Sequence, residues 1–360
     1  MSDAILLAGT RKGLFIGRSD ERRERWEWDA PAFPMEEVYS VAIDERGSSP
    51  RLLAGSTSMH YGPQVVRSDD RGRTWDRSHS GTVRFPEELG TSVERVWQLA
   101  PSPADGDVVW AGTQPSALFR SGDRGETFEL VRSLWDHPHR PEWGEGFGGQ
   151  AIHTIVPHPT DPDVVTVAMS TGGVYRSSDG GASWAPHNRG ITTEFLPGEP
   201  PEFGQCVHKV AVDAEDPDRL YAQNHGGVFR SDDAGRTWTS ISAGLPADFG
   251  FPIVAHPRRG GTVYVYPLVG SGERFPPHGR PAVWRSQDAG RSWHELGEGL
   301  PPEAWTAVLR DGFGIDRGEP VGLHVGTRHG AIWSSNDEGQ TWREIRANLP
   351  DVLCVRAAVL

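Results

Sequence analysis

An eight-residue phrase recurs along the chain and constrains its fold more than any other feature. The phrase reads Ser-x-Asp-x-Gly-x-Thr/Ser followed by Trp or Phe, and its six clear copies begin at Ser68, Ser121, Ser177, Ser231, Ser286 and Ser335. A degraded copy spans Ser19 to Trp26. A spacing of roughly 50 residues is typical of arrays in which each repeat is one supersecondary unit.

Each repeat contains four short apolar runs separated by Pro, Gly and Asp. In the repeat at 96–131, these runs are 96–100, 108–111, 117–120 and 127–131. Short apolar runs separated by these turn-forming residues predict antiparallel strands joined by turns. No segment shows a helical period over about ten residues. The sequence therefore predicts an all-β fold, a single seven-bladed β-propeller with four-stranded antiparallel blades.

The two ends of the chain are expected to meet in one blade. The first apolar run, 5–9, aligns with the second strands of later repeats, so the first blade lacks an inner strand of its own. The run 352–359 follows the last outer strand and has no partner after it. We expect it to complete the first blade, which closes the ring and removes an open sheet edge. The prediction is one domain covering residues 1–360.

Length variation is concentrated in two kinds of connection. The connections between repeats are longest at 79–93, 132–150 and 185–205. The connections between second and third strands are longest at 56–63 and 268–281. In a propeller these connections share one rim, while the repeated phrase lies on the other. Insertions on one face of a repeat protein usually mark its binding face. One long turn, around 312–320, is an exception because it falls on the other rim.

The phrase resembles the Asp-box, or BNR repeat, of sialidases, the sortilin family, some xyloglucan-cleaving glycosidases and the photosystem II assembly factor family. The resemblance covers essentially the whole chain and implies a WD40/YVTN/BNR-like propeller. In each copy we expect Asp to accept hydrogen bonds from turn amides, Gly to adopt a positive φ and the aromatic ring to be buried. These aspartates are then structural. Sialidases carry an early Arg-Ile-Pro segment, whereas the nearest fragments here, 84–86 and 274–276, lack the Ile.

Composition excludes several partners. The formal net charge of −13 argues against nucleic acid and against an anionic membrane surface. It favours a neutral or cationic ligand, although a pocket can differ from the average. No apolar run has the length of a membrane span, and the first residues read as a strand rather than a signal peptide. The two cysteines, Cys206 and Cys354, are interpreted as small buried residues. Together these features predict a cytoplasmic protein.

Two adjacent inner strands begin alike at the loop-rich face. They read Gln150-Ala-Ile-His153 and Gln205-Cys-Val-His208. The equivalent positions of other repeats are predicted to be aromatic, namely Tyr39, Trp97, Phe251 and Trp305, the last of them just before a predicted inner strand at 306–309. Other polar side chains expected on the same rim are Arg11, Glu37, His60, Glu94, His225 and His329.

These residues define the candidate site. Candidate general acids and bases for sugar chemistry are His153, His208, Glu94 and Glu37. Candidate ligand-binding residues are Arg11, His60, Gln150, Gln205, His329, Trp97 and Trp305. Candidate ligands for a divalent metal ion are His153, His208 and His225. The alternative is that these histidines only hydrogen-bond neighbouring blades.

Two functional hypotheses follow from this rim. One is a glycosidase- or lyase-like enzyme acting on a carbohydrate or another small polar substrate. Whether it uses a divalent metal ion as cofactor is left open. The other is a non-catalytic scaffold or assembly factor that binds a protein partner on the same face. The loop 135–143, rich in Trp and His, either closes over a ligand or packs on itself.

Overall fold

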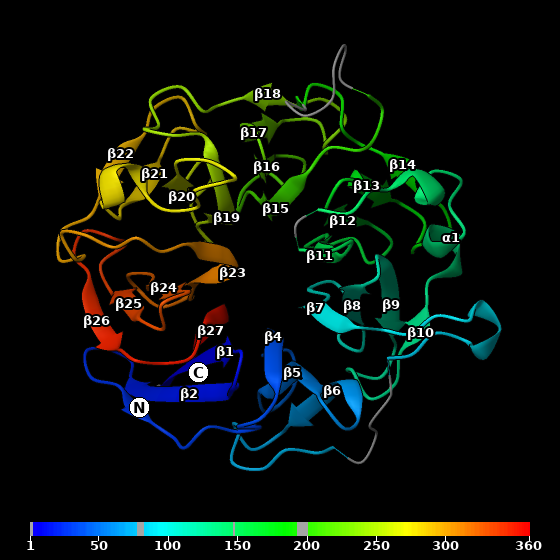
Figure 1. The fold of residues 1–360 in the computed structure, drawn as a ribbon, viewed down its shortest axis with the longest axis horizontal. Coiled ribbons are helices and arrows are strands. Elements are labelled where there is room, and N and C mark those ends of the chain that lie inside the picture. The colour runs from blue at the N-terminus through cyan, green and yellow to red at the C-terminus, as the bar shows by residue number, and fades with distance from the viewer. Residues whose placement is uncertain (1–2, 78–82, 147, 193–200) are drawn as a thin grey trace.

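A computed structural model describes residues 3–77, 83–146, 148–192 and 201–360. Its regular structure is almost entirely strands, β1 to β27, and its one α-helix in the described ranges, α1 (Arg132–Trp135), has four residues. The sheets stand around a central axis in the manner of a β-propeller (Figure 1). No helix in the described part of the chain is long and apolar enough to cross a membrane.

Four sheets contain four antiparallel strands each, in sequence order. The first comprises β7 (Arg95–Pro101), β8 (Val109–Gln114), β9 (Ala117–Ser121) and β10 (Glu129–Leu130). The second comprises β11 (Ile152–Pro157), β12 (Val165–Met169), β13 (Gly173–Ser177) and β14 (Ala185–Pro186). The third comprises β15 (Val207–Val212), β16 (Leu220–Asn224), β17 (Gly227–Ser231) and β18 (Thr239–Ser240). The fourth comprises β19 (Phe249–Ala255), β20 (Val263–Leu268), β21 (Val283–Ser286) and β22 (His294–Leu296).

The remaining strands form a three-stranded and an eight-stranded sheet. The smaller sheet comprises β4 (Glu37–Asp44), β5 (Arg51–Ser58) and β6 (Gly62–Ser68). The larger runs in the order β26-β25-β24-β23-β27-β1-β2-β3. Its strands from the last repeat are β23 (Val308–Ile315), β24 (Leu323–Thr327), β25 (Ile332–Ser335) and β26 (Arg343–Arg346). Its others are β27 (Val352–Val359), β1 (Asp3–Thr10), β2 (Gly13–Asp20) and β3 (Glu27–Trp28).

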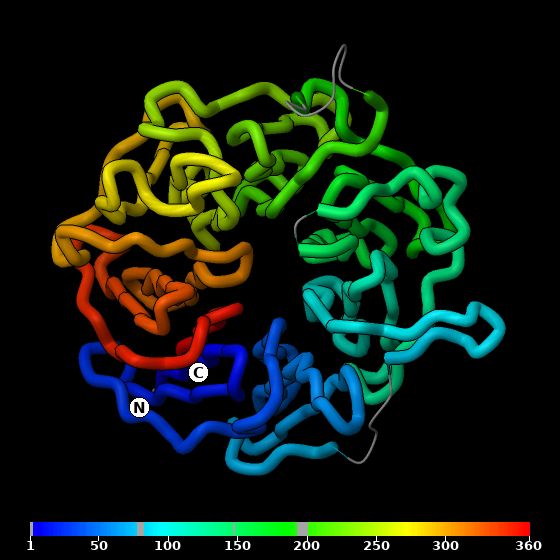
Figure 2. Tube along the Cα trace, in the orientation of Figure 1, coloured from blue at the N-terminus to red at the C-terminus, as the bar shows by residue number. Residues whose placement is uncertain are grey.

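The C-terminal strand pairs with the N-terminal strand. The antiparallel register of β27 and β1 runs from Ala4 opposite Val359 to Thr10 opposite Val352. By contrast, β27 meets β23 through a single parallel bridge, Asp311 opposite Cys354. Figure 2 shows the C-terminal segment lying over the N-terminal one. The eight-stranded sheet is therefore two four-stranded units joined at one point.

The repeated phrase forms a closed turn. In the copy at 68–75, Ser68 Oγ donates to Asp70 Oδ1 and accepts from the Gly72 amide, both at 2.8 Å. The amide and hydroxyl of Thr74 donate to the Asp70 carboxylate at 2.9 and 2.6 Å, and these bonds lower the pKa of Asp70 to about 2. Gly72 has φ +85°. Equivalent bonds recur at 121–127, 177–183, 231–237, 286–292 and 335–341.

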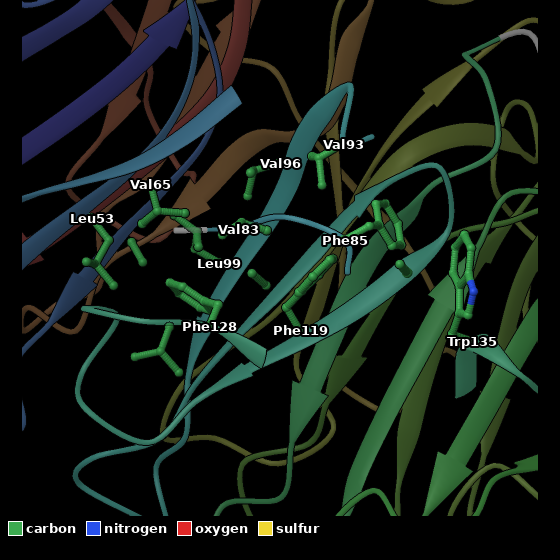
Figure 3. Packing of buried hydrophobic residues seen from close by; sticks show 14 residues of the cluster. Leu53, Val65, Val83, Phe85, Val93, Val96, Leu99, Phe119, Phe128 and Trp135 are labelled. Atoms are coloured by element: carbon green, nitrogen blue, oxygen red, sulfur yellow. The ribbon is translucent and has the colours of Figure 1, made fainter. Parts of the chain in front are cut away.

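The aromatic ring of the phrase packs between neighbouring sheets. Phe128 is 8% exposed and shares an apolar cluster with Leu53 of the preceding sheet and Phe119 of its own (Figure 3). Residues before β7, including Phe85, complete that cluster. Apolar packing of this kind is the main force holding successive sheets together, because the backbone bridges recorded between them are isolated ones, such as Arg189 opposite Thr237.

The two rims differ in their turns. Turns between second and third strands lie beside the starts of inner strands: the Arg11 amide donates to the Asp351 carbonyl at 3.1 Å, and the His225 amide to the Cys206 carbonyl at 3.0 Å. On the other rim, the repeated phrase lies beside the turn between first and second strands, since the Arg124 amide donates to the carbonyl of residue 107 at 2.7 Å. The loop-rich rim is thus the one around the starts of the inner strands.

Candidate functional site

Each inner strand carries a bulge near its start. The ladder of β7 with β8 shifts register between Val96 and Gln98, leaving Trp97 out of the pairing. Equivalent shifts occur in the other inner strands and leave out Tyr39, His153, His208, Phe251 with Pro252, 309–312, and Leu353. A bulge turns an extra side chain away from the regular pleat, and bulges are common beside active sites. Here they direct most of these side chains to the central axis.

A cavity of about 910 Å³ lies where the bulges converge. Its lining from the bulges is Tyr39, Trp97, His208, Phe251, Leu309, Arg310 and Leu353. Surrounding loops and strand ends add Arg11, Arg95, Gln114, Glu145, Cys206, His225, Arg274 and Arg328. The volume and the mixture of ring faces with a few polar groups are typical of a small-molecule site.

A charged network crosses the axis further along the inner strands. Asp311 of β23 accepts from Lys209 Nζ at 2.7 Å and from the guanidinium of Arg356 on β27. Lys209 also donates to Gln98 Oε1 of β7 at 3.1 Å. These side chains come from four inner strands and meet at Asp311 in the bulge of β23, next to the cavity-lining Arg310; we call this network the floor of the cavity.

Three ligand-type side chains meet at the cavity wall. The ligand atoms of Cys206, His208 and His225 all lie within 4.8 Å of one another. His208 Nδ1 is 2.6 Å from the Gly250 carbonyl, which only accepts, so Nδ1 carries the proton and Nε2 has a free lone pair. Burial lowers the pKa of His208 well below its usual value, and nearby Arg310 lowers it further. The imidazole is therefore neutral near pH 7.

The same three residues are the candidate metal ligands. One thiolate and two imidazoles leave an open fourth position in a zinc-type site. The sequence predicted His153 with His208 and His225, whereas the structure places Cys206 beside the two lining histidines and leaves His153 outside this group. Sequence reasoning treated Cys206 as an apolar residue. The available signal was its Cys-x-His spacing with His208, which puts both side chains on one side of an extended strand.

The predicted acid–base residues are not gathered in the cavity. His153 is 1% exposed, does not line it, and its Nε2 has no hydrogen-bond partner among the described residues. Glu37 is held by Arg11 Nη1 at 2.6 Å and Arg95 Nε at 3.5 Å. Glu94 is exposed and accepts from the Gln114 amide at 2.7 Å. In the described part of the chain, the carboxylate lining the cavity is that of Glu145.

The predicted ligand-binding residues divide into three groups. Arg11 and Trp97 line the cavity. Gln150 and Gln205 instead anchor loops, donating to the carbonyls of Trp143 and Pro201 at 2.7 Å each. His60, His329 and Trp305 are exposed and do not line the cavity.

The expected equivalence of Trp305 with the inner-strand aromatics is wrong. The sequence predicted a strand at 306–309 and a turn around 312–320, but β23 runs from Val308 to Ile315. Trp305 precedes the strand and is 51% exposed, with its ring against Phe275. Because the wide bulge lies at 309–312, Arg310 takes the cavity position that an aromatic ring was expected to occupy.

The loop 135–143 packs on itself and on the sheet beneath. Trp135 and Trp143 are 8% and 5% exposed. Trp143 Nε1 donates to the Tyr175 hydroxyl at 2.9 Å, and His139 Nδ1 lies 3.1 Å from the same oxygen. Neither tryptophan lines the cavity, so of the two alternatives the structure favours the self-packed loop.

Exposed apolar side chains gather on the cavity rim. The large hydrophobic residues exposed in the described ranges are Met35, Met59, Tyr61, Val269 and Trp305. Met35 and Trp305 precede inner strands, while the other three lie at the connections between second and third strands. All five therefore lie on the loop-rich rim.

His153 gives the first testable prediction. Burial, with Arg310 and His208 nearby, lowers its pKa well below 6.5. The unfolded chain takes up a proton near pH 6.5 that the folded chain does not, so stability is complete above that pH and falls as the pH decreases. In His153→Gln, the decline of unfolding free energy between about pH 6.5 and 5 should weaken by up to about 1.4 kcal/mol per pH unit.

Urea unfolding at several pH values measures this slope. His294→Gln is the matched control because His294 is exposed on β22, and its slope should equal that of the wild type. An unchanged slope in His153→Gln would contradict a neutral buried imidazole.

No protein-family model matches the chain. It is 24% identical over 349 residues to an oligoxyloglucan-reducing end-specific xyloglucanase of Emericella nidulans, an alignment covering 82% of this chain and 40% of that protein. It is 23% identical over 318 residues to a xyloglucanase of Acetivibrio thermocellus, covering 66% and 38%. The chain thus spans less than half the length of these curated relatives.

Solved structures share the fold. The GH74 enzyme of Niastella koreensis superposes with a TM-score of 0.60 at 17% identity, covering 93% of this chain and 54% of that one. YCF48 bound to D1 peptide superposes with a TM-score of 0.54 at 12% identity, covering 85% and 81%. These likenesses identify the β-propeller architecture, and the chain is similar in sequence to xyloglucanases over most of its length.

Proposed function

We propose that this chain is a glycan-cleaving enzyme whose substrate enters the central cavity from the apolar rim. The observation that carries the proposal is the convergence of the bulges on one cavity, where the rings of Tyr39, Trp97 and Phe251 lie beside the imidazoles of His208 and His225. Aromatic faces pack against sugar rings, and neighbouring polar groups orient hydroxyls. Sequence similarity to xyloglucanases supports a carbohydrate substrate.

His208 is the proposed general base. Its Nε2 lone pair is free because Nδ1 donates to the Gly250 carbonyl, and its lowered pKa keeps it neutral near pH 7. His225 and Glu145 also line the cavity and are the candidate acid partners. Glu37 and Glu94 are less suited to this role, since each is already held by a neighbouring side chain.

A divalent ion on Cys206, His208 and His225 is a second way to use the same residues. In that case His208 Nε2 would bind the ion rather than accept a proton, and the ion would polarise a substrate oxygen or activate water. Elemental analysis of the purified protein distinguishes the two uses.

The proposed architecture is one seven-bladed domain over residues 1–360. Support comes from the eight-stranded sheet, whose halves β23–β26 and β27-β1-β2-β3 join through a single bridge. The hydrogen-bonded turns of the repeated phrase support its role as an Asp-box on the rim away from the cavity. The cytoplasmic location stays a prediction from the sequence.

An activity assay with His208→Gln tests the proposed function. The wild type is expected to release oligosaccharides from xyloglucan or from another member of a panel of plant and bacterial glycans. Gln retains a donor for the Gly250 carbonyl but has no basic nitrogen, so kcat should fall at least about 100-fold. The measurement is product release by chromatography, with thermal unfolding to verify the fold.

His294→Gln, exposed on β22, is the matched control and should retain full activity. The proposal fails if the wild type cleaves none of the glycans, or if His208→Gln cleaves as fast as the wild type.

A protein partner on the same rim is the second candidate function. The exposed apolar side chains around the cavity mouth favour it, and a solved structure of similar fold, YCF48, is described as bound to a D1 peptide. A protein too large for the cavity would contact the rim alone. His208→Gln would then leave its binding unchanged, because His208 lies inside the cavity with 2% exposure.

A further inference from the structure

The cavity carries a surplus of positive charge although the chain is acidic. Its lining includes five arginines, Arg11, Arg95, Arg274, Arg310 and Arg328, and one carboxylate, Glu145. Two carboxylates that do not line the cavity form ion pairs with these arginines. Glu37 pairs with Arg11 and Arg95, and Asp351 pairs with Arg11 and Arg328. Five guanidiniums thus face three carboxylates, while the floor adds two cations around Asp311.

Among the described residues, no carboxylate forms an ion pair with Arg310. Its side chain lines the cavity from the bulge of β23, and its Nε is buried with no hydrogen-bond partner among the described residues. Buried charges in folded proteins are normally paired, and a buried donor without an acceptor requires an explanation.

Aromatic rings hold the Arg310 guanidinium in place. It lies 5.2 Å from the centre of the Phe251 ring and 5.8 Å from that of Trp97. The Arg274 guanidinium lies 5.6 Å from the same Phe251 ring, and its Nε donates to the Ser271 carbonyl at 2.8 Å. Cation–π contacts offset part of the cost of burial and leave the planar N–H edge available for a ligand.

We propose that the cavity binds the anionic group of a ligand, a carboxylate, sulfate or phosphate, on the guanidinium of Arg310. As a statement about the substrate, this inference rests on the proposed function and selects acidic sugars over neutral ones. A planar guanidinium presents paired N–H donors that match two oxygens of such a group. The arginines that line the cavity thus contrast with the formal net charge of −13 of the whole chain.

Isothermal titration at constant ionic strength tests the proposal with named probes. Glucuronate, glucose 6-sulfate and glucose 6-phosphate identify the preferred anionic group, glucose is the uncharged comparison, and inorganic phosphate tests the anion alone. At least one acidic sugar should bind the wild type at least about tenfold more tightly than glucose. Arg310→Met should remove that preference, so that the acidic sugar binds no better than glucose.

Stability distinguishes a ligand-binding arginine from a structural one. Removing a half-buried cation whose Nε lacks a hydrogen-bond partner among the described residues should leave the ligand-free Arg310→Met protein with a melting temperature equal to or above that of the wild type. The acidic sugar should raise the melting temperature of the wild type and have no such effect on this variant. If Arg310→Met does not fold, Arg310→Lys replaces it in the test. Lys keeps the positive charge but lacks the paired N–H donors of the guanidinium, so the preference for acidic sugars over glucose should weaken.

The matched control is Arg280→Met. The Arg280 side chain is 71% exposed, pairs with Glu295 and does not line the cavity. The Arg280→Met protein should therefore prefer acidic sugars over glucose as strongly as the wild type does. The inference is overturned if glucose binds as tightly as every acidic sugar, or if Arg310→Met retains the preference. Cleavage of neutral glycans without any anion preference would overturn this inference and leave the proposed function standing. Selective anion binding without cleavage of any glycan would support this inference and overturn the proposed function.

Discussion

A chain shortened by removal of residues 352–360 is expected to lose cooperative unfolding. The lost strand β27 pairs with β1 along its length and buries Val352, Leu353 and Val355, each at most 4% exposed. A fully buried Val or Leu contributes about 1.5–3 kcal/mol, so these three contribute roughly 5–9 kcal/mol. That is comparable to the whole stability of an ordinary domain, about 5–15 kcal/mol.

Circular dichroism during urea and thermal unfolding measures this result. Ala357→Ser in the full-length chain is the control, because Ala357 is only partly buried, and its unfolding free energy should change by less than about 1 kcal/mol. A synthetic peptide of residues 352–360 should restore part of the folded signal of the shortened chain. A sharp transition in the shortened chain, with a loss below about 2 kcal/mol, would contradict the expected role of β27.

Asp311→Ala is expected to lower the free energy of unfolding by about 3–5 kcal/mol. The carboxylate lies between Lys209 Nζ, at 2.7 Å, and the Arg356 guanidinium. Burial would raise the pKa of Asp311, but the two cations lower it. Removing the carboxylate leaves two cations without their counter-charge near the axis of the molecule, where water screens them poorly.

The pH dependence of this contribution has a definite sign. Because the folded pKa is below the unfolded value of about 3.9, Asp311 stabilises the protein fully above that pH. The stabilisation is lost as the pH falls toward the folded pKa. Above about pH 5, the difference in unfolding free energy between wild type and Asp311→Ala should therefore not change with the protonation of this carboxyl.

Asp29→Ala is the matched control for Asp311→Ala. Asp29 pairs with Arg18 at 2.7 Å, but its side chain is 43% exposed, and its loss should cost less than about 1 kcal/mol. Adding Lys209→Met to Asp311→Ala should recover part of the lost stability, because it removes one of the unpaired cations. Equal costs for the two aspartates would show that the network at the axis contributes little.

Local sequence rules predicted the strands and turns well. Pro, Gly and Asp determine where a strand ends, and the repeated phrase contains every donor and acceptor of its own turn, so neither depends on distant residues. Strand order predicted that Arg11, Trp97, His208 and His225 share one rim, and all four line the cavity, whereas His60, His329 and Trp305, predicted by the same reasoning, do not.

The details of the cavity depend on strand register, which local rules do not determine. The predicted strand at 306–309 ended where the wide bulge of β23 begins, so Arg310 was overlooked and Trp305 was placed at the axis. Cys206 was interpreted as an apolar residue because its cavity neighbours His208 and His225 become visible only after folding. The buried state of His153 likewise depends on which way its bulge turns.

At two of the bulges, the residue that lines the cavity is distinct from the residues that pair the strands. Trp97 and Tyr39 are skipped by their ladders, so replacing them removes no cross-strand pair. Their neighbours Val96 and Val38 remain paired and buried. One scaffold can therefore acquire a different specificity through changes at these few positions, while its folding energy is determined elsewhere. For directed evolution, a library restricted to Tyr39 and Trp97 should contain a high fraction of folded variants, whereas Asp311, in the bulge of β23, should be left unchanged.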